Sequence, residues 1–261
     1  MMRLISRTGL LVAILFALDF AGCAMQPAGS SGQKTITRLQ ASAKAHTELA
    51  ASYYERNQLG VALEELGKAL RAEPNYAPAY NVRGLVNMAL HEDRQAEDDF
   101  LHSLQLDNSD SGTLNNYGWF LCQRGRERDS IKQFMAALKN PLYNTPEKSY
   151  VNAGVCSKKG GNAKDAEEFL QKALVLQPNM PEALLGLADM SFANGDYAGA
   201  KSYFMRFAQA SDPSSLTAEN LWLAVRIERK LGDRNSEESY ALQLRKRFPD
   251  SRETQLILHG Q

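Results

Sequence analysis

The side chains with the most reactive chemistry are three cysteines and four histidines, and their spacing argues against catalysis. A metal site needs its ligands clustered, whereas the histidines are scattered over different predicted helices and the C-terminal tail. They are His46, His91, His102 and His259. The chain contains no Gly-rich phosphate loop, no His-Glu-x-x-His and no Gly-x-Ser-x-Gly motif. We therefore expect a protein that is not an enzyme and that uses no cofactor, no metal and no small-molecule substrate.

The N-terminal segment has the order of a secretion signal. Arg3 and Arg7 provide a positive start, and residues 9–18 form an apolar run of ten residues, which is too short to span a bilayer but suits a signal peptide. The run is followed by Asp19 and then by Phe-Ala-Gly-Cys ending at Cys23. This resembles a bacterial lipobox and predicts a signal peptide at 1–22 with lipidation of Cys23. The alternatives are a plain secretory signal or an uncleaved anchor, with an incidental cysteine.

The residue after Cys23 bears on the destination. In Gram-negative lipoproteins an aspartate there favours retention in the inner membrane, and this chain has Ala24. The resemblance thus implies the periplasmic face of the outer membrane, where several acyl chains give a firm hold. Residues 23–34 are predicted to form the lipidated cysteine and a flexible tether, because they are rich in small and polar residues.

The remainder, 35–261, is repetitive. Ala-Leu-Arg-Ala-Glu-Pro-Asn at 69–75 is nearly copied by Ala-Leu-Val-Leu-Gln-Pro-Asn at 173–179. A period of 34 residues with small residues at equivalent places resembles the tetratricopeptide repeat (TPR). The resemblance implies an all-α fold, a right-handed superhelical solenoid of about six helix-turn-helix repeats. The predicted repeats are 43–76, 77–110, 111–144, 147–180, 181–214 and 218–251.

Small and bulky residues alternate between the two helices of each repeat. In the first helix a small residue follows an early large one by four positions, as in Tyr80 and Gly84. In the second helix a bulky residue follows an alanine by four positions, as in Ala96 and Phe100. Because this spacing puts both residues on one helical face, we expect the paired helices to approach closely. The sixth repeat departs from the pattern at Val225, which is typical of a capping repeat.

The first helices of such a solenoid line a concave groove, and apolar side chains exposed there indicate a binding surface. Some of them, alternatively, fill the core between helices. The asparagines recurring on these helices would bond either the backbone of an extended peptide or groups within the repeat. The predicted protein-binding groove consists of Tyr54, Asn81, Leu85, Met88, Asn115, Trp119, Val151, Val155, Leu185 and Phe192.

Cys122 and Cys156 are 34 residues apart on the first helices of neighbouring repeats. The periplasm favours disulfides, and closing a loop of about 35 residues would stabilise the fold by about 3–4 kcal/mol in the chain-entropy model. The alternative is a pair of buried free thiols, since free cysteine packs well in helical cores.

The charge balance limits the classes of partner. The chain has 30 Lys+Arg and 30 Asp+Glu, whereas binding nucleic acid requires a concentrated positive field. We therefore expect no nucleic acid as partner, and a monomer that binds another polypeptide.

Three segments go beyond a general TPR pattern. They are Leu-Asn-Asn-Tyr-Gly-Trp-Phe-Leu-Cys at 114–122, Asn-Pro-Leu-Tyr at 140–143 and Asn-Ala-Gly-Val-Cys at 152–156. With the lipobox and the six repeats, they resemble the type IV pilus biogenesis and stability lipoproteins of the PilW/PilF kind, the pilotins. The resemblance implies an adaptor that binds the secretin subunit and promotes its outer-membrane localisation and multimer assembly, as pilus biogenesis and twitching motility require. The alternative is a TPR lipoprotein that scaffolds peptidoglycan enzymes or outer-membrane protein assembly.

Overall fold

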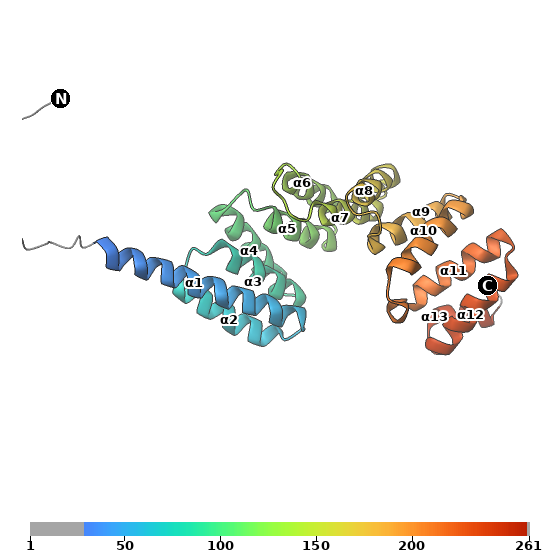
Figure 1. Cartoon of the computed structure of the whole chain (residues 1–261), viewed down its shortest axis with the longest axis horizontal. Coiled ribbons are helices and arrows are strands. Elements are labelled where there is room, and N and C mark those ends of the chain that lie inside the picture. The colour runs from blue at the N-terminus through green and yellow to red at the C-terminus, as the bar shows by residue number, and fades with distance from the viewer. Residues whose placement is uncertain (1–28, 260–261) are drawn as a thin grey trace, which may run out of the picture. The chain divides into compact units, whose positions relative to one another are not determined.

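The computed structural model describes the backbone of residues 29–259 and the side chains of residues 37–259, and this part of the chain is helical without strands (Figure 1). The prediction of an all-α fold is therefore confirmed for the described residues. From Leu39 onward the described residues form one compact unit, and this unit contains the helix pairs. The helices are α1 (Gly29–Glu55), α2 (Leu59–Ala72), α3 (Ala77–Ala89), α4 (Asp93–Leu106), α5 (Ser111–Gln123), α6 (Glu127–Ala137), α7 (Pro146–Lys159), α8 (Ala163–Leu176), α9 (Pro181–Ala193), α10 (Tyr197–Ala210), the short 3-10 helix η1 (Pro213–Ser215), α11 (Ala218–Leu231), α12 (Arg234–Arg247) and α13 (Arg252–Leu258).

The N-terminal end of α1 differs from the predicted tether. The helix begins at Gly29, so residues 29–34 are helical rather than a flexible linker. Once the segment 39–55 is helical and packed, each further residue adds one hydrogen bond without a new nucleation cost. The proline that precedes this helix is Pro27, and residues 29–55 contain none that would stop the extension. The predicted signal peptide and Cys23 lie outside the described residues, and no helix within them is long and apolar enough to cross a membrane.

Beyond α2 the helices pack as consecutive pairs. Each of α3–α4, α5–α6, α7–α8, α9–α10 and α11–α12 makes its most extensive contact within the pair (Figure 1). The first helices also touch one another along the series α3, α5, α7 and α9. These first helices therefore share one face of the stack, and α13 packs against α11 and α12 at its end.

The alternation of small and bulky residues explains how closely the paired helices approach. A Cβ added at Gly84 would lie 2.8 Å from Phe100 Cε1, and one added at Gly118 would lie 2.7 Å from Phe134 Cε1. Phe100 and Phe134 have no exposed surface. In these two pairs the ring of the second helix thus occupies the space that a side chain on the first helix would need.

One residue in each connection between paired helices adopts a left-handed backbone conformation. These residues recur at about the repeat period and have φ between 57° and 81°. Glycine adopts this region without steric cost, and asparagine and histidine are among the side chains that tolerate it best. His91 is therefore a turn residue. The set comprises Asn57, His91, Gly125, Gly161, Gly195 and Gly232.

Tyr117 on α5 makes the free energy of unfolding depend on pH in the alkaline range. Its hydroxyl donates a hydrogen bond to Glu97 Oε1 at 2.8 Å, and burial together with the Glu97 carboxylate raises the pKa of Tyr117 to about 12. Because the phenol is neutral when protonated, its contribution to stability is complete below pH 10, the ordinary tyrosine pKa, and is lost as pH rises from there towards 12. After allowance for solvent screening we expect a loss of about 1–2 kcal/mol.

Urea unfolding at pH 9 and at pH 11.5 measures this loss. The Tyr117→Phe variant has no phenol at this position, so its free energy of unfolding should fall by correspondingly less over the same interval. An equal fall in both proteins would contradict the assignment.

Candidate protein-binding groove

The predicted groove residues divide by exposure. Val155 on α7 is the most open, with 38% of its surface exposed. Seven others are half-buried, which leaves part of each side chain accessible: Tyr54, Asn81, Leu85, Met88, Trp119, Leu185 and Phe192.

Two predicted groove residues are buried, and their assignment to the groove is corrected here. Val151 is 5% exposed and packs in the core cluster with Ala166 and Leu170 of its own helix pair. Asn115 is 9% exposed and accepts hydrogen bonds from Ser149 Oγ at 2.9 Å and from Asn152 Nδ2 at 3.1 Å. Both side chains face neighbouring helices, because adjacent repeats pack against each other at these positions.

The asparagines join repeats to one another. Asn152 on α7 bonds Asn115 on α5, and Asn116 Nδ2 donates to Asn81 Oδ1 on α3 at 3.0 Å. A buried amide needs such partners to offset its lost hydration. These contacts link the first helices of consecutive repeats. They differ from both predicted arrangements, in which the asparagines bond a bound peptide or groups within their own repeat.

A cavity of 530 Å³ opens among the first helices α7, α9 and α11. Its apolar lining comes from Val155, Leu185, Trp222 and Leu223. Charged side chains surround this lining, and one pair of them, Lys158 and Asp189, forms a salt bridge across α7 and α9. We name this cavity the α7–α11 groove. An apolar lining with charged groups around it is typical of a site that binds another molecule.

The sequence analysis missed Trp222, Leu223 and Arg226 in this groove. The repeat register contains the signal for two of them, because Leu185 and Trp222 hold the fifth position of their repeats, and Val155 and Arg226 hold the ninth. The interpretation of the sixth repeat as a cap leaves its first helix out of the predicted groove. In the structure that helix, α11, lines the groove like α7 and α9.

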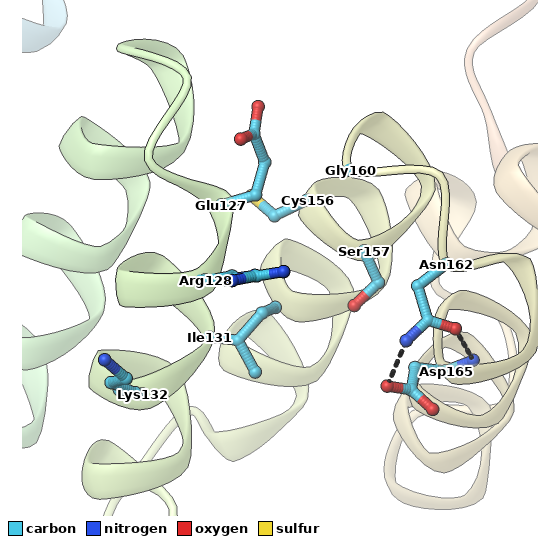
Figure 2. A pocket seen from close by; sticks show the side chains of 9 residues that line it. All are labelled: Glu127, Arg128, Ile131, Lys132, Cys156, Ser157, Gly160, Asn162 and Asp165. Atoms are coloured by element: carbon cyan, nitrogen blue, oxygen red, sulfur yellow. Dashed lines mark hydrogen bonds between the residues drawn. The ribbon is translucent and has the colours of Figure 1, made fainter.

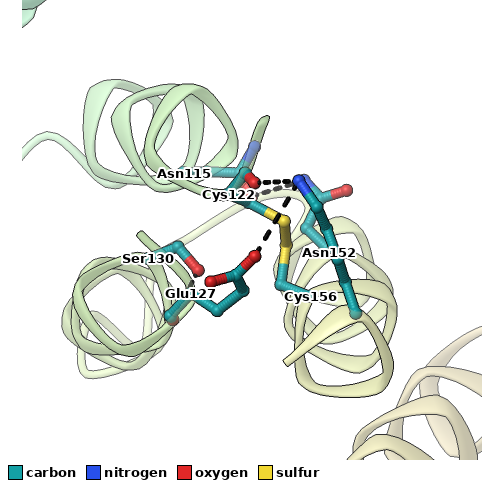
Figure 3. Close-up of a disulfide and its surroundings, with 7 residues drawn as sticks. Asn115, Cys122, Glu127, Ser130, Asn152 and Cys156 are labelled. Atoms are coloured by element: carbon teal, nitrogen blue, oxygen red, sulfur yellow. Dashed lines mark hydrogen bonds and ion pairs between the residues drawn. A yellow bond between two sulfur atoms is a disulfide. The ribbon is translucent and has the colours of Figure 1, made fainter. Parts of the chain in front are cut away.

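Cys122 on α5 and Cys156 on α7 form a disulfide with a Cα–Cα distance of 5.8 Å (Figure 3). Both residues are buried. Lys159 reinforces the same junction, since its Nζ donates to the Cys122 carbonyl at 2.6 Å and lies 3.9 Å from Glu127 Oε1. The helix pairs α5–α6 and α7–α8 are thereby covalently joined.

A second cavity, of 500 Å³, lies among α6, α7 and α8 beside the disulfide (Figure 2). Polar residues dominate its lining, including Arg128, Lys132 and the hydrogen-bonded pair of Asn162 and Asp165. Over the described residues, no group of three or more His, Cys, Asp or Glu side chains is placed to hold a metal ion. The α7–α11 groove offers more apolar surface and is therefore the stronger candidate for binding a polypeptide.

Comparisons with known proteins agree with this architecture. Residues 159–211 match the tetratricopeptide repeat family. The type IV pilus assembly protein PilF of Pseudomonas aeruginosa is 28% identical over 244 residues, which is 94% of this chain and 95% of the relative. An uncharacterized protein of Haemophilus influenzae is 29% identical over 165 residues, 62% of this chain and 87% of the relative.

Solved structures give the same result. The structure of PilW, a widely conserved type IV pilus biogenesis factor, superposes with a TM-score of 0.75 at 32% identity, covering 83% of this chain and 98% of PilW. The structure of Pseudomonas aeruginosa PilF superposes with a TM-score of 0.78 at 28% identity, covering 85% of this chain and 99% of PilF. The chain therefore belongs to the PilF/PilW family of TPR proteins of type IV pilus biogenesis.

Proposed function

We propose that this protein is a pilotin: an outer-membrane lipoprotein adaptor that binds the secretin subunit of the type IV pilus system and promotes its localisation and multimer assembly. The observation that carries the binding part is the α7–α11 groove, an apolar cavity open on the shared face of the first helices. The family membership supports a role in pilus biogenesis. The lipobox-like sequence ending at Cys23 supports the membrane anchor.

The mechanism is recruitment without chemistry. Acyl chains on Cys23 hold the adaptor at the periplasmic face of the outer membrane, and the first-helix face captures a secretin segment. Because both are then confined to one surface, the effective concentration of secretin there rises and assembly into the multimer is favoured. No covalent bond is made or broken.

Removing the anchor tests the proposal. In a strain that expresses Cys23→Ala, we expect the protein in the soluble periplasmic fraction and secretin multimers in the outer membrane reduced about fivefold or more, since the gain in effective concentration is lost. Native gels of separated membranes measure the multimer. Arg234→Gln is a matched control, because it changes an exposed residue of α12 and leaves both the lipidation site and the disulfide intact.

Variants in the predicted groove test capture separately from anchoring. Leu185 lines the α7–α11 groove, whereas Leu85 and Trp119 are half-buried on α3 and α5. Leu85→Asp, Trp119→Ala and Leu185→Asp should stay helical by circular dichroism and membrane-bound, yet recover less secretin when the protein is purified from crosslinked membranes. Normal secretin multimers in the anchor variant and in all groove variants would refute the proposal. Recovery of a murein hydrolase in place of secretin would favour the peptidoglycan scaffold instead.

A further inference from the structure

The α7–α11 groove contains a cation without a counterion. The guanidinium carbon of Arg226 lies 4.7 Å from the ring centroid of Phe192 and 5.9 Å from that of Trp222. Its Nε is buried and has no hydrogen-bond partner. Within the described part of the chain Arg226 forms no ion pair.

Three cations near the groove each have a carboxylate partner. Lys158 pairs with Asp189 across the same groove, Arg229 Nε lies 2.7 Å from Glu237 Oε1, and Lys201 lies 2.8 Å from Glu228 Oε2. A buried guanidinium N–H that lacks an acceptor loses its hydration without replacement, which costs free energy. Two aromatic rings offset only part of this cost, so the site is suited to an incoming acceptor.

The acidic edge of the groove, formed by the first turns of α9 and α11, carries the reverse charge. Glu182 and Glu219 lie in the first turns of α9 and α11, where a carboxylate is stabilised by the helix dipole. A hydrogen bond from Thr217 lowers the pKa of Glu219, so it is ionised at neutral pH. Neither carboxylate forms an ion pair with another described residue. The groove therefore has an acidic edge, an apolar floor and a cationic edge at Arg226.

We propose that the α7–α11 groove takes a polypeptide segment whose apolar side chains cover Leu185 and Trp222 and whose carboxylate pairs with Arg226. This rests on the proposed function, because the segment is assigned to the captured secretin. An arginine already held against two rings has less side-chain entropy left to lose, and its planar fork matches a carboxylate in two parallel hydrogen bonds. The apolar contacts bury surface area, and the ion pair between Arg226 and the carboxylate selects segments with an acidic residue at one end.

The acidic edge fixes the orientation in which the segment binds. A second carboxylate placed near Glu182 and Glu219 would be repelled, whereas a basic or neutral residue would not. The segment therefore enters with its acidic end towards Arg226. Asp189 does not compete for Arg226, because Lys158 already neutralises it.

Binding of the purified periplasmic region of the same organism's secretin to the full-length chain in detergent tests this assignment. Biolayer interferometry compares wild type, Arg226→Gln and Arg226→Lys with the control Arg234→Gln, an exposed arginine outside the groove. We expect Arg226→Gln to weaken binding about tenfold or more and Arg226→Lys to restore part of the loss. Arg234→Gln should match wild type, and circular dichroism checks that each variant is folded.

A photocrosslinker identifies the segment. p-Benzoylphenylalanine placed at position 155, on the groove wall, should trap a secretin peptide that contains Asp or Glu. Replacing that acid by its amide should weaken binding to wild type as much as Arg226→Gln does, and should have no further effect on the Arg226→Gln variant.

The outcomes separate the two proposals. Secretin that binds with equal affinity to wild type and Arg226→Gln, or a crosslinked segment whose acid is dispensable, overturns the assignment of Arg226 and leaves the proposed function standing. If the wild-type chain binds no secretin, the proposed function fails and the assignment fails with it.

Discussion

Replacing Phe134 by alanine is expected to lower the free energy of unfolding by about 3–5 kcal/mol, the range for emptying a buried aromatic site. The Phe134 ring has no exposed surface and fills the space left by the missing side chain of Gly118. It also belongs to the core cluster around the disulfide, with Cys122, Ala153 and Cys156. Because the disulfide joins the surrounding helices, they cannot close freely over the void, so the cavity cost should lie towards the upper end of the range.

Chemical unfolding followed by circular dichroism measures this loss. Met135→Ala is the matched control, since Met135 is the next residue of the same helix and is 37% exposed. It should cost less than about 1 kcal/mol. A loss below about 1 kcal/mol for Phe134→Ala would mean that the contact between α5 and α6 does not stabilise the fold as described.

Removing the disulfide with the double variant Cys122→Ala and Cys156→Ala is expected to cost about 3–4 kcal/mol, because the unfolded chain regains the freedom of a loop of about 35 residues. For a chain of this size that corresponds to a fall in Tm of about 6–16 °C. Calorimetry of the wild type with and without reductant gives an independent measurement of the same quantity.

Thiol counting and a combined variant provide the controls. Denatured, unreduced wild-type protein should contain no free thiol from Cys122 or Cys156, and two free thiols would rule out the bridge. Since Phe134 and the disulfide share one cluster, the losses from Phe134→Ala and from the cysteine variant should not add. Strict additivity would contradict the shared packing.

The predictable part of the fold comes from local spacing. The pairs Gly84–Phe100 and Gly118–Phe134 are expected from positions four residues apart on each helix, and the structure places them in contact. That spacing does not reveal that His91 holds a turn position. The last four repeats have glycine at this position, whereas a histidine is first considered as a candidate for catalysis or metal binding. Comparison of equivalent positions would have identified it.

The groove was only partly predictable. The repeat register indicates which first-helix positions face it, but it does not show how far a neighbouring repeat covers each one. Val151 and Trp222 both hold the fifth position of their repeats, yet Val151 is buried in the core between α7, α8 and α9 and Trp222 lines the α7–α11 groove. The difference depends on side chains that belong to other repeats.

By itself, the sequence determined the helical period, the pairing of helices and the absence of a recognisable catalytic motif, because these depend on residues close together along the chain. Only the tertiary structure decided which groove positions remain open, that the asparagines bond one another, and that Arg226 lies between two rings without a carboxylate. The asparagine contacts and the Arg226–Phe192 contact join residues 34 to 37 positions apart, and such contacts depend on how each repeat packs against the next.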